Sequence, residues 1–191
     1  AEVAARALPP DSLVGEQLRA LASEAIAEDE ALRDSKLPTV RTRLIRLADD
    51  LGFEPVREAP VPEAWPAPAP VGDVVIKDYA AYRMARAPMR SGGDMTAFWT
   101  LFQHIQSNDI PMTAPVQMDH ARGKGDQATE RTAMAFLYES TERGRLGTEG
   151  KVEVVDVLAA TWVSIGARGY ETQDSVDDLL ADLRHWLATH S

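Results

Sequence analysis

The chain has no cysteine among its 191 residues, and this absence removes several kinds of site. Without thiols there is no disulfide, no thiolate metal site, no cysteine nucleophile and no cysteine-ligated haem. Any metal chemistry must therefore use histidine, methionine, tyrosine or carboxylate side chains.

Long apolar runs are also missing. No uninterrupted apolar stretch approaches the roughly 20 residues that a membrane-spanning helix needs, and no charged-then-apolar signal segment opens the chain. We therefore expect a soluble protein without membrane insertion. The chain begins at Ala1 rather than at methionine, so a cytoplasmic location and export after signal removal both stay open.

Positive charge is scarce, because 20 Lys and Arg residues face 30 Asp and Glu residues, for a net charge of -10. Such a charge repels phosphate backbones, and no run of basic residues offsets it locally, so we expect no nucleic-acid binding. The length suits one ordinary domain with an appendage, and a hydrophobic content of 45% suffices for a core.

The first 53 residues predict a helical hairpin. Apolar residues recur at helical spacing from residue 11 to about residue 33, and again from about Pro38 to Leu51, where Pro38 suits a first turn. Residues 54–72 then hold six of the twelve prolines and predict a semi-rigid extended linker. We expect Trp65 to dock this linker on the domain that follows, residues 73–191. The alternative for the linker is a ligand for an SH3-type domain.

An internal repeat organises the rest of the chain. VVIKDYAAYRMARA (residues 74–87) matches VEVVDVLAATWVSIGARG (residues 152–169), and an amphipathic helical pattern follows each copy, at residues 95–105 and 176–187. Further strands are expected at residues 115–119 and 132–139. The sequence therefore predicts an α+β fold of two strand-then-helix halves related by a pseudo-twofold axis.

The segment IPMTAPV, residues 110–116, lies between a helical pattern and a strand pattern. Its two prolines force Ile110 and Ala114 toward extended conformations. Because proline cannot donate to a ladder, Pro115 should lie at a strand start, an edge or a bulge. The segment is therefore predicted to switch the chain from helix to strand.

Taken together, these motifs resemble the SOUL haem-binding family. The resemblance covers about residues 74–187 and depends on the V-x-I-x-x-Y strand of Val74, Ile76 and Tyr79, the MTAPV signature at residues 112–116, and the second strand-helix half. It implies a distorted antiparallel β-barrel flanked by two helices and built from the repeat. The N-terminal hairpin lies outside it.

Two departures from the family pattern stand out. Some members have a histidine in the first strand that is proposed as an axial haem ligand, and Asp78 occupies that position here. Members also continue past the second helix into closing strands, which this sequence does not show. The resemblance therefore implies haem or another tetrapyrrole as ligand, held without that axial bond.

Eight side chains are candidates for the tetrapyrrole site, as apolar walls, as cations for the propionates or as an iron ligand: Met95, Trp99, Phe102, His104, Met112, Arg83, Arg86 and Arg90. Trp99 is the preferred wall and His104 the candidate axial ligand, because both flank the apolar stripe of their helix. The alternative for His104 is a local hydrogen bond, and the alternative for Met112 is a place in the core.

No catalytic constellation is visible in the sequence. There is no Ser/His/Asp set, no HExxH and no pair of carboxylates at a meaningful helical spacing. The leading interpretation is non-catalytic binding of haem or a related tetrapyrrole, as a carrier or buffer. Two alternatives stay open: a ligand-independent protein-interaction module, and an enzyme that acts on a flat hydrophobic ligand in the same groove. The protein partner and the oligomeric state stay open as well.

Overall fold

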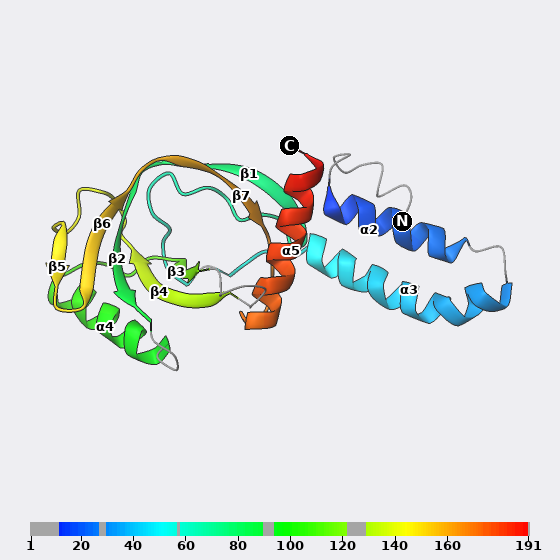
Figure 1. The fold of residues 1–191 in the computed structure, drawn as a ribbon, viewed down its shortest axis with the longest axis horizontal. Coiled ribbons are helices and arrows are strands. Elements are labelled where there is room, and N and C mark those ends of the chain that lie inside the picture. The colour runs from blue at the N-terminus through cyan, green and yellow to red at the C-terminus, as the bar shows by residue number, and fades with distance from the viewer. Residues whose placement is uncertain (1–11, 27–29, 57, 90–93, 122–128, 191) are drawn as a thin grey trace.

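The computed structural model describes residues 12–26, 30–56, 58–89, 94–121 and 129–190. Within these residues it has four helices and two antiparallel sheets of two and five strands (Figure 1), so the α+β expectation is confirmed. The elements are α2 (Leu13–Ala25), α3 (Glu30–Leu51), β1 (Val74–Tyr79), β2 (Tyr82–Pro88), α4 (Asp94–Ser107), β3 (Val116–Ala121), β4 (Glu130–Leu137), β5 (Gly147–Glu149), β6 (Val152–Val157), β7 (Ala160–Ile165) and α5 (Gln173–Thr189).

The N-terminal helices α2 and α3 form a hairpin whose interface is apolar. Ser12 caps α2 by accepting a hydrogen bond from the amide of Gly15 at 3.1 Å. Apolar residues of the two helices then pack into one buried cluster of Val14, Leu18, Leu21, Val40 and Leu47.

The expected boundaries of these helices were wrong. The first helix ends at Ala25, well before residue 33, and the second begins at Glu30 with Pro38 inside it. Apolar periodicity continues across the connection, so it gives no signal of where one helix stops. A proline inside a helix costs one backbone hydrogen bond without ending the helix in every case.

One long antiparallel ribbon runs through both sheets. β1 pairs with β7 and β2 pairs with β6 in a single register, because Tyr79 lies opposite Ala160 and Tyr82 opposite Val157. The ribbon is interrupted at residues 80–81 on one strand and 158–159 on the other, which are equivalent positions of the sequence repeat. Each copy of the repeat thus forms two strands rather than one, β1 and β2 or β6 and β7, and a helix follows each pair.

The repeat also places matching polar pairs on either side of the interruption. Arg83 lies opposite Asp156 and donates to both of its carboxylate oxygens, from Nε at 2.7 Å and from a terminal nitrogen at 2.9 Å. At the equivalent position of the other half, Thr161 lies opposite Asp78 and donates to its carboxylate at 2.6 Å. An aspartate of each copy therefore bonds to a residue of the other copy.

The strands do not form the closed barrel that the resemblance implies. The five-stranded sheet has the order β3-β4-β2-β6-β5, and β1 and β7 pair only with each other. β2 has a neighbour on each side, whereas no strand among the described residues fills the corresponding place beside β7. The result is an open, curved arrangement, with α4 on the sheet and α5 beside β7 (Figure 1).

The proline-rich segment, residues 53–72 and here called the strap, is fastened to the sheets at several points. The amide of Glu63 donates to the Glu139 carbonyl at 2.9 Å. Trp65 docks as expected, with edge-to-face contacts to Tyr79 and Tyr82 at centroid distances of 4.9 and 5.2 Å. Next to the strap's end, Gly166 has no room for a side chain, because a Cβ there would collide with the Pro70 carbonyl. The strap therefore packs on the middle of the ribbon through Trp65 and on one of its ends at Gly166.

Candidate ligand-binding cavity

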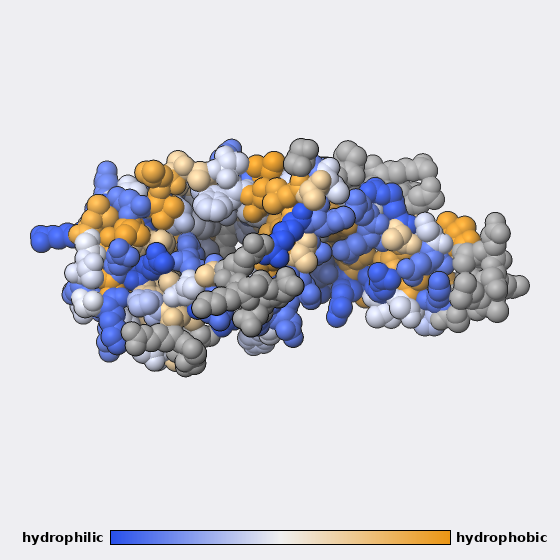
Figure 2. Space-filling model, viewed as in Figure 1, coloured by the Kyte–Doolittle hydropathy of each residue, from blue (hydrophilic) through white to orange (hydrophobic). Residues whose placement is uncertain are grey.

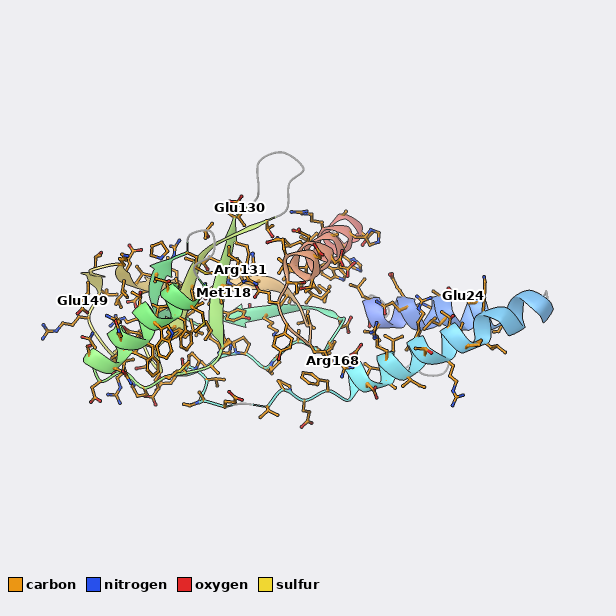
Figure 3. All side chains as sticks on the ribbon, turned by 90° about the horizontal axis from the view of Figure 1, so that it is seen from below. Glu24, Met118, Glu130, Arg131, Glu149 and Arg168 are labelled. Atoms are coloured by element: carbon orange, nitrogen blue, oxygen red, sulfur yellow. The ribbon has the colours of Figure 1, made fainter. Side chains whose placement is uncertain are left out.

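A cavity of about 1100 Å³ lies between the strap and the strands. Five segments line it: the end of α3, the strap, the inner face of β1, the MTAPV segment and the end of β7. Figure 3 shows the strap running from α3 along the sheets. Most wall residues are apolar, aromatic or proline: Phe53, Val61, Trp65, Pro66, Pro68, Pro70, Val71, Tyr79, Ala114, Pro115 and Ile165. The cavity is therefore a preformed apolar site.

The MTAPV segment is hydrogen-bonded both to β4 and to the strap. Thr113 is buried and donates to the Leu137 carbonyl at 2.6 Å, which ties the segment to β4. The next amide, of Ala114, donates to the Pro60 carbonyl of the strap at 2.8 Å. Ala114 and Pro115 are joined by a cis peptide bond and both line the cavity. Pro115 directly precedes β3, so the expectation that it stands at a strand start is confirmed.

Lys77 is a charged side chain of the cavity wall without a protein partner. Its side chain comes from β1, two residues before Tyr79 and on the same face of the strand. No hydrogen bond or ion pair joins it to any residue that the structure describes. Desolvation by burial lowers the pKa of the Lys77 ammonium. Lys77 is not among the candidates that the sequence predicts, although the alternation in VVIKDY places it on the same face as Tyr79.

The other charges at the cavity are paired or exposed. Asp50, at the end of α3, forms an ion pair with Nε of Arg168 at 2.7 Å. The Arg168 guanidinium also lies 5.7 Å above the centre of the Phe53 ring. Figure 3 shows Arg168 at the junction between the sheets and the hairpin. Glu54 is exposed. Lys77 is therefore the only unpaired, partly buried charge among the described residues that line the cavity.

His104 lies away from this cavity, buried between α4 and the sheet. Its Nε2 is 3.0 Å from the Tyr138 hydroxyl, and its Nδ1 is 2.9 Å from a Glu149 carboxylate oxygen. Burial raises the pKa of the Tyr138 hydroxyl. Both ring nitrogens of His104 are thus engaged in protein contacts. No cluster of three or more histidine and acidic side chains suited to a metal ion occurs in the part of the chain that the structure describes.

Of the other candidates on α4, two face solvent and Phe102 is half-buried against the core. Met95 and Trp99 are 64% and 51% exposed. Phe102 stacks on Phe98 at 6.1 Å and meets Trp99 edge-to-face at 5.6 Å. Met112 is also partly exposed, so it is not the core residue that the alternative expected. Phe98, Trp99 and Phe102 thus form an aromatic face on α4, and none of them lines the cavity.

The arginine candidates are held by acidic partners. Arg83 is buried in its pair with Asp156 and also donates to the carbonyls of Arg143 and Gly144. Arg86 pairs with Asp119 of β3 at 3.2 Å. Arg90 lies outside the described residues. Neither Arg83 nor Arg86 lines the cavity.

The hairpin has a second apolar groove on its surface. A smaller apolar groove of about 360 Å³ lies on the hairpin, where Val40, Leu44 and Ile45 of α3 meet Ala25 of α2. Figure 2 shows hydrophobic residues scattered among hydrophilic ones over the visible face. None of the described helices combines the length and the apolar character that crossing a bilayer requires.

No protein-family model matches the chain, and no curated protein matches it either.

Proposed function

We propose that this protein binds haem or a related tetrapyrrole without catalysing a reaction, and that the ligand occupies the strap cavity. The observation that carries the proposal is the cavity itself, about 1100 Å³ in volume and walled by proline and aromatic side chains. Small-molecule sites range from about 300 to 1,000 Å³. A cavity slightly above this range suits a large ligand with apolar faces.

The walls favour a rigid, flat ligand on energetic grounds. Burial of apolar surface contributes roughly 25 cal/mol per Å², and the prolines of the strap lose little conformational entropy when a ligand binds. Trp65 is already fixed against Tyr79 and Tyr82, so one aromatic wall needs no ordering. Because little conformational entropy is lost on binding, most of the free energy gained from these contacts contributes to affinity.

The family resemblance supports the same ligand class. We propose a SOUL-like fold whose barrel is opened beside β7, because the family's MTAPV signature lines the cavity here through Ala114 and Pro115. His104 is engaged by Tyr138 and Glu149, so the proposal does not use it as an iron ligand. In this arrangement shape and charge hold the tetrapyrrole, as expected for a carrier.

A haem titration followed at the Soret band tests both the function and the location. Ala167 is an exposed residue that lines the cavity, so Ala167→Trp should obstruct the cavity without disturbing the core. We expect saturable one-to-one binding by the unmodified protein and at least a tenfold loss of affinity in Ala167→Trp. Trp99→Ala, which trims the aromatic face of α4, should leave the affinity unchanged.

Each other outcome is informative. Loss of binding in Trp99→Ala alone would move the ligand to the face of α4 and would refute the cavity assignment. A weak signal that does not saturate and is equal in all three proteins would refute haem as the ligand.

A further inference from the structure

We infer that the strap cavity selects flat apolar ligands that carry an anionic group, and that Lys77 supplies the countercharge. This inference deepens the proposed function, because it concerns the same cavity and names the ligand chemistry that the cavity recognises. It depends on the position of one ammonium group among apolar walls.

The geometry of β1 places the charge next to an aromatic wall. Side chains alternate between the faces of a strand, so Lys77 and Tyr79 share the face that lines the cavity. Trp65 contacts Tyr79 edge-to-face at 4.9 Å. A ligand that stacks along these rings therefore has its edge within reach of the flexible Lys77 side chain.

Lys77 differs from the arginines near the ribbon in having no partner among the described residues. Arg83, Arg86 and Arg168 each form an ion pair with an aspartate, at 2.7, 3.2 and 2.7 Å. A ligand anion would have to break one of these pairs to use an arginine. The ligand anion can pair with Lys77 without breaking an existing ion pair. This pairing also stabilises the charged form of the ammonium, which desolvation disfavours.

The net charge of the protein makes the inference easy to refute. At -10 the molecule repels anions over long range, and a purely apolar cavity would favour a neutral ligand over its anionic analogue. A measured preference for the anion must therefore come from a local cation. Among the described residues that line the cavity, Lys77 is the only cation.

The test compares two fluorescent probes that share a flat ring system, 1-pyrenebutyrate and 1-pyrenebutanol. We expect the unmodified protein to bind the carboxylate about tenfold more tightly than the alcohol, as a charge-assisted hydrogen bond to a partly buried ammonium provides. Lys77→Met should remove this preference while the affinity for 1-pyrenebutanol stays within about twofold, because the apolar walls remain.

Two further variants control the test. Lys151→Met removes an exposed lysine of the turn before β6 and should leave both affinities unchanged. Lys77→Arg keeps the charge and should keep the preference, so it separates charge from shape. If Lys77→Met fails to fold, as judged by circular dichroism, Lys77→Gln takes its place in the comparison.

The outcomes separate this inference from the proposed function. Equal affinities for the two probes in the unmodified protein, or a preference that survives Lys77→Met, would overturn the role of Lys77. Failure to bind haem together with a preference that depends on Lys77 would refute the tetrapyrrole and leave the anion selectivity intact. If Ala167→Trp weakens haem binding but Lys77→Met does not, haem binding in the cavity would stand and the role of Lys77 would be refuted.

Discussion

The two strand-then-helix halves share one sequence pattern but differ in how deeply their helices are buried. α4 lies on the five-stranded sheet and buries Ala97, Leu101 and Ile105, of which Leu101 is 0% exposed. α5 lies beside the two-stranded sheet and buries only Trp186 fully. The rest of its apolar stripe is half-buried, except for the exposed Leu187.

The number of strands beneath each helix explains this difference. β2 pairs with both β4 and β6, whereas β7 pairs only with β1 among the described strands. The apolar stripe of α4 therefore meets a wide apolar surface, and that of α5 meets a narrow one. The cavity opens on the narrow side, where β1 and the end of β7 meet the strap. Space for a ligand thus exists where the sheet offers less surface for packing.

The largest expected effect comes from trimming one leucine in each half. Leu101→Ala should reduce the free energy of unfolding by about 3 kcal/mol, because it leaves a cavity in a fully packed core. Leu183→Ala, on the half-buried stripe of α5, should cost only about 1 kcal/mol. Urea unfolding followed by circular dichroism measures both, with Leu158→Ala, at an 81% exposed site, as the neutral control. Equal costs would contradict the comparison.

Much of the fold could be predicted because it depends on local patterns. The repeat indicated both strand-then-helix halves, and the two prolines of IPMTAPV placed a strand start after Pro115. The connection between α2 and α3 was misplaced because Leu32 continues the apolar spacing beyond it. The open edge of β7 could not be predicted, because strand pairing joins distant segments of the chain and hydrophobic periodicity reports only on local structure.

The candidate site was harder to predict because its walls come from five separate segments. The sequence reading chose residues on and near one helix, and the structure places Trp99 on an exposed face and His104 in hydrogen bonds with other residues. Lys77 was hidden because a lysine in a strand is ordinarily exposed. Only the strap, which turns back over β1, makes that face of the strand an interior wall.

The two polar pairs across the ribbon, Arg83–Asp156 and Thr161–Asp78, also differ in burial, and we expect their contributions to stability to differ in the same direction. Arg83→Met removes a buried guanidinium and leaves the Asp156 carboxylate unpaired, which we expect to cost about 1–3 kcal/mol. The lower part of this range reflects solvent screening, because the Asp156 side chain is 34% exposed. Thr161→Val removes the equivalent hydrogen bond in the other half, at an exposed site, and should cost less than about 0.5 kcal/mol. Thermal unfolding of both variants measures the difference, and a larger loss in Thr161→Val would show that the two pairs do not rank by burial.

The smallest expected effect concerns how α5 is held in place without a deep core. The Asp177 carboxylate accepts a hydrogen bond from the backbone amide of Thr129 at 3.1 Å, and it also accepts from the side chains of Thr129 and Gln173. The amide of Thr129 is the main cause that lowers the pKa of Asp177 below its ordinary value of 3.8. The ionised form is therefore the one that holds the helix.

A lowered pKa in the folded state fixes the direction of the pH dependence. The stabilisation from Asp177 is fully present above the ordinary aspartate pKa and is lost as the pH falls through the lowered folded-state pKa. Asp177→Asn should accordingly speed amide exchange in the first turns of α5 at neutral pH and leave α4 unchanged. At pH values below the lowered folded-state pKa of Asp177, the variant and the unmodified protein should converge, because protonation then removes the charge that the asparagine lacks at every pH. Faster exchange in α4, or a difference that persists in acid, would show that α5 depends on core packing after all.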